Sequence, residues 1–340
     1  QDDEAGTMTL FISSLHCSLS AVTSKPNCSS NCRLTHDFPV CIANSAVLGL
    51  CFVLGVPGNI AVLVMLVRRL KEKNFTHSLM LSLAVSDLLT LLPLPVWIWA
   101  FLNSWIFGSI VCKIISYVQY WGIFCSVFCV TLMSIQRYMQ VLHPQAWAKL
   151  GDKGQMCLLA VIWILSGLLA SYSLIQRDIG CDQHGFQFCF QKFSTDTEKV
   201  ITLSLEILLF LICFFMLVVF YYRLHRGVKE SQFFISSSRM TKLVKRIIAV
   251  FFILYILLPF ANFLIIIAVL LENHNLSSIA DYCAKVSKAL TLVNSCVNPF
   301  LYAFSLQELR CPFTYRFSTT CIKCSSHLRA QRSPASSTDC

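Results

Sequence analysis

Apolar residues dominate seven stretches of the chain, and each stretch is long enough to cross a lipid bilayer. A helix of about 20 residues spans roughly 30 Å of hydrocarbon. Windows of that length fall at residues 41–67, 75–102, 109–141, 156–176, 200–224, 243–271 and 282–304. Several of the short connections contain turn-forming Gly or Asn, as in "LNSWIFG" and "LENHNL". The pattern predicts an all-α membrane protein, a seven-transmembrane helix bundle without a soluble domain.

The polar parts of the chain flank this bundle. Residues 1–40 form an amino-terminal segment, residues 41–304 the transmembrane domain and residues 318–340 a tail. Residues 305–317 contain "LQELRCPFTYRF", which predicts a short amphipathic helix on the membrane surface after the seventh stretch. Phe313 and Phe317 would face lipid, and Arg310 and Arg316 would face the headgroups.

Lys and Arg are divided unequally between the two sides of the predicted bundle. With the amino terminus outside the cell, nineteen of the 27 Lys and Arg residues fall in the inner loops and the tail. Such an excess marks the cytoplasmic side, so we expect an extracellular amino terminus and a cytoplasmic carboxyl terminus. Only 13% of the residues are charged, against about a quarter in soluble domains. We therefore expect a multi-pass plasma-membrane protein that contacts membrane lipid.

Composition and spacing argue against several functional classes. The net charge of +10 does not indicate a nucleic-acid partner, because the basic residues gather beside apolar stretches rather than on a water-soluble face. The eight histidines are scattered without metal-ligand spacing, so no enzyme or metal centre is predicted. A retinal-type pump needs a lysine in the middle of the seventh stretch, yet Lys285 and Lys288 lie near its outer end. A transporter would show more ionisable residues than Asp87 and Glu206.

Eight cysteines lie at or near the predicted outer face, where disulfides persist. We expect Cys112, at the start of the third stretch, to pair with Cys189 in "QFCFQ". A second bridge is expected between Cys283 and one amino-terminal cysteine, with the partner open. At least one of the others is expected to be a free thiol; the set is Cys17, Cys28, Cys32, Cys41, Cys112, Cys181, Cys189 and Cys283.

Two kinds of covalent modification are predicted from local sequence. Asn27 in "NCS" and Asn275 in "NLS" are glycosylation acceptors on the outer side, whereas Asn74 in "NFT" lies inside. Cys321 and Cys324 follow the amphipathic segment and are candidates for palmitoylation. The serines of the tail offer phosphorylation sites for arrestin recruitment, the alternative being an unmodified tail.

Polar residues inside the apolar stretches narrow the class of protein. In chain order they include Asn59, Asp87 in "LAVSD", Cys112 twenty-five residues before Arg137, Trp163, Pro259 and the "NPFLY" of Asn298, Pro299 and Tyr302. This set, in this order, resembles the rhodopsin-like (class A) family of G-protein-coupled receptors from about residue 41 to residue 317. The resemblance implies a receptor that binds an extracellular ligand and activates a heterotrimeric G protein.

Finer spacings resemble the chemoattractant branch of that family, and within it the leukotriene B4 receptors. Pro95 lies eight residues after Asp87, as in chemokine-type receptors. Arg177 lies fourteen residues after Trp163, and Glu206 lies seventeen after Cys189, as in leukotriene receptors. The resemblance implies an anionic lipid ligand of leukotriene B4 type and a Gi-type G protein. The alternatives are a chemokine- or complement-type peptide receptor and a non-signalling scavenger receptor of the same fold.

The expected ligand site lies among the outer halves of the helices. Two cations above an aromatic, apolar pocket suit an amphiphilic anion, whose carboxylate would pair with Arg177 or Lys288. Glu206 would bind a ligand hydroxyl or neutralise Arg177. Other candidate lining residues are Gln119, Tyr120, Tyr117, Trp97 and Trp99. In the alternative interpretation, Trp97 and Trp99 belong to the interfacial aromatic belt and Lys288 extends outward.

An aspartate in the middle of the membrane costs roughly 2.5–3.5 kcal/mol on insertion scales, so Asp87 requires a compensating environment. The resemblance implies an allosteric sodium ion there, and no other cofactor. The alternative is a hydrogen-bonded polar core that holds only water. The predicted oxygen-lined pocket consists of Asp87, Ser126, Asn294, Ser295 and Asn298.

The inner end of the third stretch carries the predicted switch. In the family an acid precedes the arginine and holds it by an ion pair, but here Gln136 precedes Arg137. Gln136 can accept one hydrogen bond from Arg137 but supplies no charge, so we predict a weaker resting latch and raised basal signalling. The competing outcome is weak coupling, as in a scavenging receptor. The resemblance implies further residues of this switch, namely Tyr138, Tyr222, Asn298, Pro299, Tyr302 and the hinge proline Pro259.

Two positions depart from the family pattern in the relay between ligand and switch. The helix-six motif has a tryptophan two residues before its proline, where this chain has Leu257. The proline of helix five is also missing, and Phe214 stands in its place. The route from ligand to switch is therefore expected to differ from that of the family.

Overall fold

The computed structural model describes residues 38–68, 75–181, 185–230, 238–284 and 286–301. Tyr302, Asn27, Cys321, Cys324 and the segment 305–317 lie outside these residues, so the predictions made for them stay predictions. The helices are α2 (Phe38–Arg68), α3 (Phe75–Leu91), α4 (Leu94–Asn103), α5 (Gly108–Leu142), α6 (Pro144–Ala170), α7 (Tyr172–Gln176), α8 (Asp196–Glu230), α9 (Ser238–Tyr255) and α10 (Leu257–Leu270). A last helical stretch covers 274–284 and 286–301.

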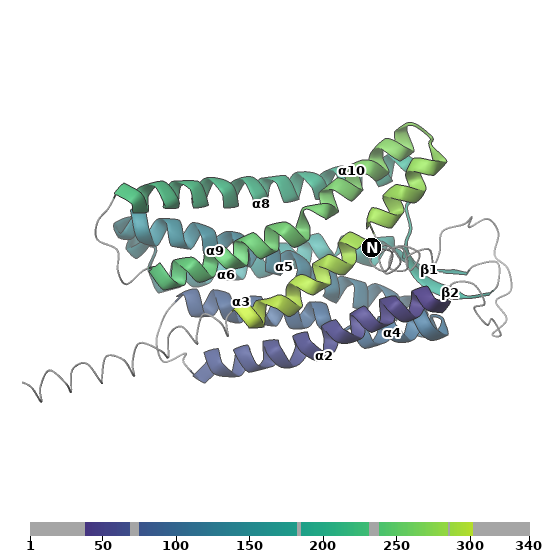
Figure 1. Cartoon of the computed structure of the whole chain (residues 1–340), viewed down its shortest axis with the longest axis horizontal. Coiled ribbons are helices and arrows are strands. Elements are labelled where there is room, and N and C mark those ends of the chain that lie inside the picture. The colour runs from purple at the N-terminus through teal and green to yellow at the C-terminus, as the bar shows by residue number, and fades with distance from the viewer. Residues whose placement is uncertain (1–37, 69–74, 182–184, 231–237, 285, 302–340) are drawn as a thin grey trace, which may run out of the picture.

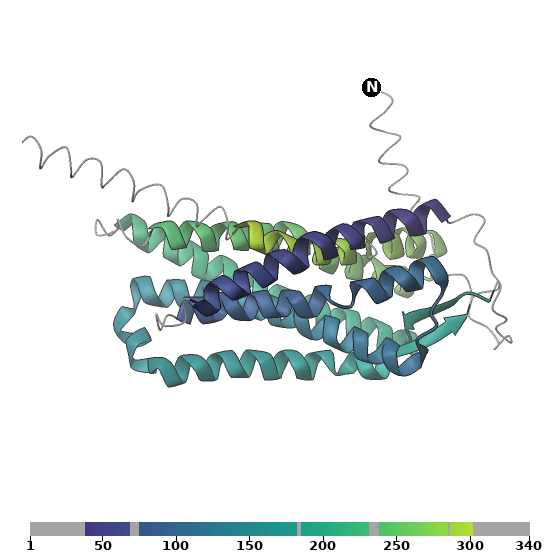
Figure 2. The same ribbon diagram turned by 90° about the horizontal axis from the view of Figure 1, so that it is seen from below.

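The long helices run alongside one another, with α5 in the interior (Figures 1 and 2). Helix α5 contacts α3, α6, α8 and α9. Gly122 permits a close approach of α5 to α3, because a Cβ atom there would lie 2.5 Å from the Ser86 carbonyl oxygen. The predicted seven-helix bundle is confirmed.

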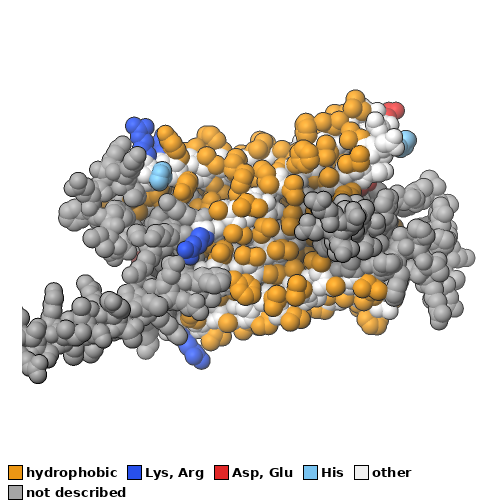
Figure 3. Space-filling view, in the orientation of Figure 1, with side chains coloured by type: hydrophobic (Ala, Val, Ile, Leu, Met, Phe, Trp, Pro, Cys, Tyr) orange, Lys and Arg blue, Asp and Glu red, His pale blue; other side chains and the backbone are white. Residues whose placement is uncertain are grey.

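Six helices of the described chain are long and apolar enough to cross a membrane, and the last helical stretch falls where the seventh was predicted. Large apolar side chains point outward, among them Leu50, Phe215 and Phe260. Figure 3 shows hydrophobic side chains across the middle of one face, with the visible Lys and Arg toward one end. Exposing so much apolar surface to water is unfavourable, whereas contact of that surface with the hydrocarbon of a membrane is not.

Proline and glycine explain where the helices depart from the predicted ranges. The stretch 75–102 is divided between α3 and α4 at Pro93, and the stretch 243–271 is divided after Tyr255. Pro259 lacks the N–H group that would bond the Tyr255 carbonyl four residues earlier, so α9 ends there and α10 begins. Helix α6 begins at Pro144, well before the predicted residue 156, and Gly151 breaks it with φ of +61°.

A two-stranded hairpin is an addition that the all-α prediction lacked. Strand β1 (Arg177–Cys181) pairs antiparallel with β2 (Gln187–Gln191), placing Ile179 opposite Cys189. It lies at one end of the bundle (Figure 1). A Cβ atom on Gly180 would approach the Phe188 ring to 2.9 Å, so glycine lets the aromatic side chains of β2 cover β1.

Candidate ligand site, ion site and switch

The hairpin is fixed to the bundle by covalent and hydrogen bonds. Cys189 of β2 forms a disulfide with Cys112 of α5, with the Cα atoms 5.8 Å apart, which confirms the predicted pair. The backbone N–H of Trp105 donates to the Gln187 carbonyl oxygen at 2.9 Å. The hairpin therefore has a fixed position over the Asn103 end of α4 and the Gly108 end of α5.

The second predicted bridge is wrong in its choice of cysteine. Cys283 carries a free thiol, whereas Cys181, the last residue of β1, is disulfide-bonded. Cys181 ends β1, and β1 pairs with β2, the strand that the Cys112–Cys189 disulfide attaches to the bundle. Cys283 instead packs beside the apolar cluster of Leu203, Ala261 and Ala280.

Arg177 begins β1 and points its guanidinium toward α5. Its Nη2 atom donates to the Tyr120 hydroxyl at 3.1 Å, and its Cζ atom lies 5.6 Å from the centre of the Tyr120 ring. The one ion pair found among the described residues joins Lys192 to Asp178 at 3.2 Å. The charge of Arg177 is thus paired with a neutral phenol and with the ring face, and a ligand carboxylate could take over its donor groups.

Glu206 of α8 lies near this cation. Its carboxylate accepts a hydrogen bond of 2.8 Å from Asn262 Nδ2 of α10, and it interacts electrostatically with Arg177 and Lys288. Asn262 is buried, with 4% of its surface exposed. Two cations and one carboxylate leave an excess positive charge, which favours an anionic ligand.

The remaining predicted lining residues separate into two groups. Trp97 faces inward, with its ring centre 5.4 Å from that of Trp105, whereas Trp99 is 47% exposed on the surface of α4. Tyr117 packs 5.7 Å from Trp121 toward α6, away from the Arg177 contact. Gln119 is half-buried, and Lys288 is exposed. Arg177 and Tyr120 are therefore the predicted ligand residues that the structure brings into direct contact, with Glu206 near Arg177.

Asn262 is the member of this cluster that the sequence did not reveal. It lies three residues after Pro259 in an otherwise apolar helix. A polar side chain in such a helix usually faces a partner inside the bundle, and this signal was available.

The second polar cluster surrounds Asp87, which is fully buried. Asn298 Nδ2 donates to Asp87 Oδ2 at 2.8 Å. Asp87 Oδ1 and Ser126 Oγ are buried without a hydrogen-bond partner among the described residues, although Ser126 and Ser295 both lie close to the carboxylate. Unpartnered oxygens beside a single carboxylate fit a small monovalent cation, since hard cations prefer oxygen ligands. Asn294, with a buried and unpartnered Nδ2, lies on the same helical stretch as Asn298.

At the opposite end of α5, Gln136 and Arg137 share one acceptor. Gln136 Nε2 donates to Thr76 Oγ1 at 2.8 Å, and Arg137 Nη2 donates to the same oxygen at 3.2 Å. Arg137 Nη1 also donates to Gln140 Oε1 at 3.3 Å. The expected bond from Arg137 to Gln136 is not formed, because both side chains donate to Thr76 Oγ1 and Gln136 Oε1 has no hydrogen-bond partner among the described residues. The latch is instead a contact of α5 with the uncharged Thr76 hydroxyl of α3, without an ion pair.

The arginine is held inside the bundle in this structure. Only 9% of the Arg137 surface is exposed, so it does not extend to lipid headgroups. The Tyr138 hydroxyl lies 3.1 Å from His143 Nε2, and its ring packs 5.0 Å from Phe220 of α8. Tyr222 is 62% exposed on α8. Pro299 closely approaches Gly58 of α2, where an added Cβ atom would lie 2.9 Å from Pro299 Cβ.

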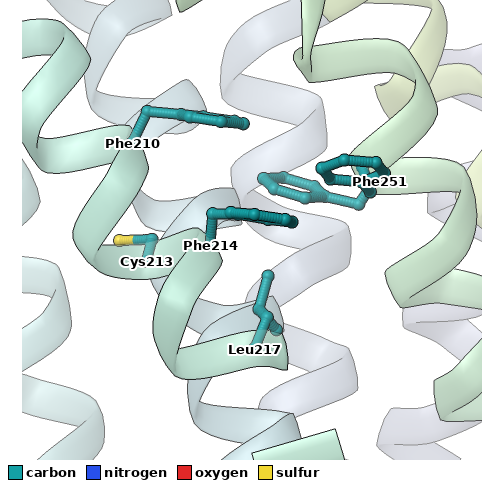
Figure 4. A pocket seen from close by; sticks show the side chains of 6 residues that line it. Phe210, Cys213, Phe214, Leu217 and Phe251 are labelled. Atoms are coloured by element: carbon teal, nitrogen blue, oxygen red, sulfur yellow. The ribbon is translucent and has the colours of Figure 1, made fainter. Parts of the chain in front are cut away.

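The two positions that depart from the family pattern differ in their surroundings. Phe214 stacks on Phe252 of α9 with ring centres 4.6 Å apart, whereas Leu257 is 40% exposed. Figure 4 shows Phe210 and Phe214 projecting from the same side of α8 into a small pocket, with Phe251 opposite. The space between α8 and α9 is thus filled by aromatic rings.

Comparison with known proteins decides the family. The sequence profile of the 7 transmembrane receptor (rhodopsin family) matches residues 58–302. The chain belongs to this family. Rhodopsin-family membership implies an extracellular ligand and a G protein, and it makes the chain a multi-pass membrane receptor rather than an enzyme.

Individual relatives of this rhodopsin-family receptor are named as apelin and chemokine receptors. Apelin receptor A of Xenopus laevis is 31% identical, with 79% of this chain and 77% of the relative covered. Human C-C chemokine receptor type 8 is 27% identical, with 83% of this chain and 81% of the relative covered. Mouse atypical chemokine receptor 2 is 28% identical, covering 78% and 71%.

Proposed function

We propose that this receptor binds an extracellular anionic lipid of leukotriene B4 type and responds by activating a Gi-type G protein. The observation that carries the proposal is the position of Arg177, whose guanidinium bonds the neutral Tyr120 and forms no ion pair with another described residue. A carboxylate in place of the phenol would form a charge-assisted bond, which is roughly twice as strong as a neutral one.

The neighbouring groups favour a ligand that is both amphiphilic and hydroxylated. Glu206 and Asn262 form a polar pair between α8 and α10, beside an apolar cluster that includes Leu203, Ala261 and Ile265. A carboxylate oxygen and an amide can both bond a hydroxyl group. An acyl chain would occupy the apolar side while its carboxylate binds Arg177.

A chemokine-type peptide is the second candidate, and the names of the relatives favour it. Human C-C chemokine receptor type 8 and apelin receptor A of Xenopus laevis align with more than three quarters of the chain. An acidic side chain or terminal carboxylate of a peptide would satisfy Arg177 equally well. The two candidates differ in size rather than in charge.

We further propose how the receptor is placed and controlled. The hairpin end would face the extracellular medium and the Arg137 end the cytosol of a cell with this receptor in its plasma membrane. Sodium would occupy the space beside Asp87 Oδ1 and Ser126 Oγ in the resting state, and arrestin would bind the receptor after activation. Exposed Asn275 is accessible for glycosylation in this orientation.

The test is nucleotide exchange on purified Gi by the full-length receptor in lipid nanodiscs. Leukotriene B4, human C-C chemokine ligands and apelin peptides are titrated separately. We expect leukotriene B4 to stimulate exchange and Arg177→Ala to raise its half-maximal concentration about 30-fold or more, as for a lost charged hydrogen bond. Lys192→Ala is the matched control, because Lys192 is a cation of the same loop already paired with Asp178.

Stimulation only by a peptide would reject the lipid in favour of the second candidate. Ligand binding without exchange on any G protein would support a scavenging receptor. Equal effects of Arg177→Ala and Lys192→Ala would remove Arg177 from the ligand site.

A further inference from the structure

The ligand site and the latch lie at opposite ends of the bundle, so a physical connection must join them. In the family pattern the tryptophan before the helix-six proline is part of that connection, but Leu257 replaces it here. Leu257 is 40% exposed and carries no ring or polar group. The side chain at this position therefore does not bridge the ligand site and the interior of the bundle.

One face of α8 supplies a continuous alternative. Glu206, Phe210 and Phe214 are spaced four residues apart, and residues at this spacing lie above one another on a helix. The Phe210 and Phe214 rings are stacked with centres 6.1 Å apart and an angle of 5° between their planes. Figure 4 shows these two rings on the same side of α8. The face begins at the ligand cluster and continues toward the cytosolic half.

This face contacts both halves of the broken helix-six segment. At its outer end, Glu206 accepts a hydrogen bond from Asn262 of α10. At its inner end, Phe214 stacks on Phe252 of α9 at 4.6 Å and an interplanar angle of 20°. Pro259 lies between Asn262 and Phe252 in sequence, and the helix is interrupted at Ile256. A change at Glu206 can thus act on α10, on one side of the Pro259 hinge, while the stack of Phe214 on Phe252 holds α9 on the other side.

Helix α9 continues from Phe252 to the core around the latch. Its Ile247 and Phe251 are each 2% exposed and belong to the buried cluster that contains Met133, four residues before Arg137. Movement of α9 would loosen this cluster at the inner end of α5. Phe214 and Phe252 also line a small pocket at this contact.

We propose that Glu206, Asn262, Phe210, Phe214 and Phe252 form the path by which ligand binding moves α9. A ligand that draws the Glu206 carboxylate away from Asn262 releases α10 from α8. The aromatic stack then transmits the change across the hinge to the cytosolic half. This path rests on the proposed function only in requiring that the ligand act near Glu206.

Asn262→Leu removes the donor and leaves the half-buried Glu206 carboxylate without it, which imitates the action of the ligand. We expect ligand-free nucleotide exchange on purified Gi to rise about tenfold, as for the loss of a charged hydrogen bond. Phe214→Leu alone should leave basal exchange within about twofold, because the Asn262 contact still holds α10. In the Asn262→Leu background, Phe214→Leu should abolish the rise.

Adjacent outward-facing residues provide matched controls. Phe263 and Phe215 follow Asn262 and Phe214 directly and are 53% and 67% exposed. Phe263→Leu should leave basal exchange unchanged, and Phe215→Leu should preserve the rise caused by Asn262→Leu. If Asn262→Leu behaves like Phe263→Leu, or if Phe214→Leu behaves like Phe215→Leu, the path is rejected.

A second readout separates this proposal from the proposed function. Genetically encoded spin labels at the exposed Ala148 on α6 and Ala249 on α9 report the position of α9 without a G protein or ligand. Asn262→Leu should increase the population at the longer label distance, and Phe214→Leu should reverse that increase. An unchanged distance distribution rejects the path. If the label distances change as expected but no variant stimulates exchange on Gi, only Gi coupling is rejected.

Discussion

Replacing Gln136 by Glu tests whether the neutral latch sets basal activity. Gln136 is fully buried and donates to Thr76 Oγ1 at 2.8 Å, the same oxygen that Arg137 contacts at 3.2 Å. Gln136→Glu preserves side-chain length but reverses this contact, because the Thr76 hydroxyl must then donate to the carboxylate. The new negative charge also lies beside the Arg137 guanidinium, which has few other partners.

The size of the effect follows from the two kinds of hydrogen bond. A neutral bond contributes about 1 kcal/mol and a bond to a charged group about 1.5–3 kcal/mol. Burial of the carboxylate offsets part of the difference, although the guanidinium it neutralises is itself only 9% exposed. We take a net stabilisation of the resting state of about 1 kcal/mol, which corresponds to about a fivefold change in an equilibrium constant.

The assay is ligand-free nucleotide exchange on purified Gi, measured at equal receptor density in nanodiscs. We expect Gln136→Glu to lower basal exchange about fivefold and Thr76→Val, which removes the shared acceptor, to raise it. Gln145→Glu is the matched control, since it adds the same charge at an exposed position on the neighbouring α6. Its basal exchange should equal that of wild type.

Unchanged basal exchange in Gln136→Glu, with Gln145→Glu also unchanged, would refute the argument that the missing charge loosens the resting state. A rise rather than a fall would show that the cost of burying the carboxylate exceeds its attraction to Arg137.

Three further predictions concern stability. Cys112→Ser removes a disulfide with a sequence separation of 77 residues, which stabilises the folded receptor by about 4.5 kcal/mol in the chain-entropy account. Thermal unfolding of this variant should therefore occur at a lower temperature. Cys283→Ser, which replaces a free thiol, should have little effect on the unfolding temperature. Sodium chloride should raise the unfolding temperature relative to an organic chloride salt, and Asp87→Asn should abolish that difference; an equal response in both proteins would argue against the sodium site. Gly122→Ala should destabilise the receptor by about 1–3 kcal/mol by overlap with α3, while Gly49→Ala, with nothing within 4 Å, should be neutral in the same unfolding assay.

The sequence predicted the helices well because a membrane-spanning helix needs a long apolar stretch wherever it packs. It did not predict the hairpin, because β1 and β2 have five residues each and depend on their pairing and on the bond to Cys112. Such strands carry little local signal, and tertiary contacts decide their formation. The boundaries near Pro93 and Pro259 were recoverable from the missing N–H groups.

The site residues likewise divide into those that the sequence predicted and those that depend on tertiary contacts. Arg177 and Glu206 were predicted by spacing, and the structure gives them a common neighbourhood. Their partner Asn262 and the latch acceptor Thr76 were not predicted, since each lies far along the chain from the residue it binds. The sequence separation is 56 for Glu206 and Asn262 and 60 for Thr76 and Gln136. No local pattern encodes a contact of that range, and only the packing of the helices brings the atoms together.

The most direct test of the account is the coupling between the two ends of the receptor. Leukotriene B4 affinity is measured for the nanodisc receptor alone and with nucleotide-free Gi. Because coupling between binding sites is reciprocal, we predict about tenfold tighter ligand binding with Gi, lost in Arg137→Ala while the affinity of the uncoupled receptor is unchanged. Identical ligand affinity with and without bound Gi would contradict the claim that the outer site controls the Arg137 switch.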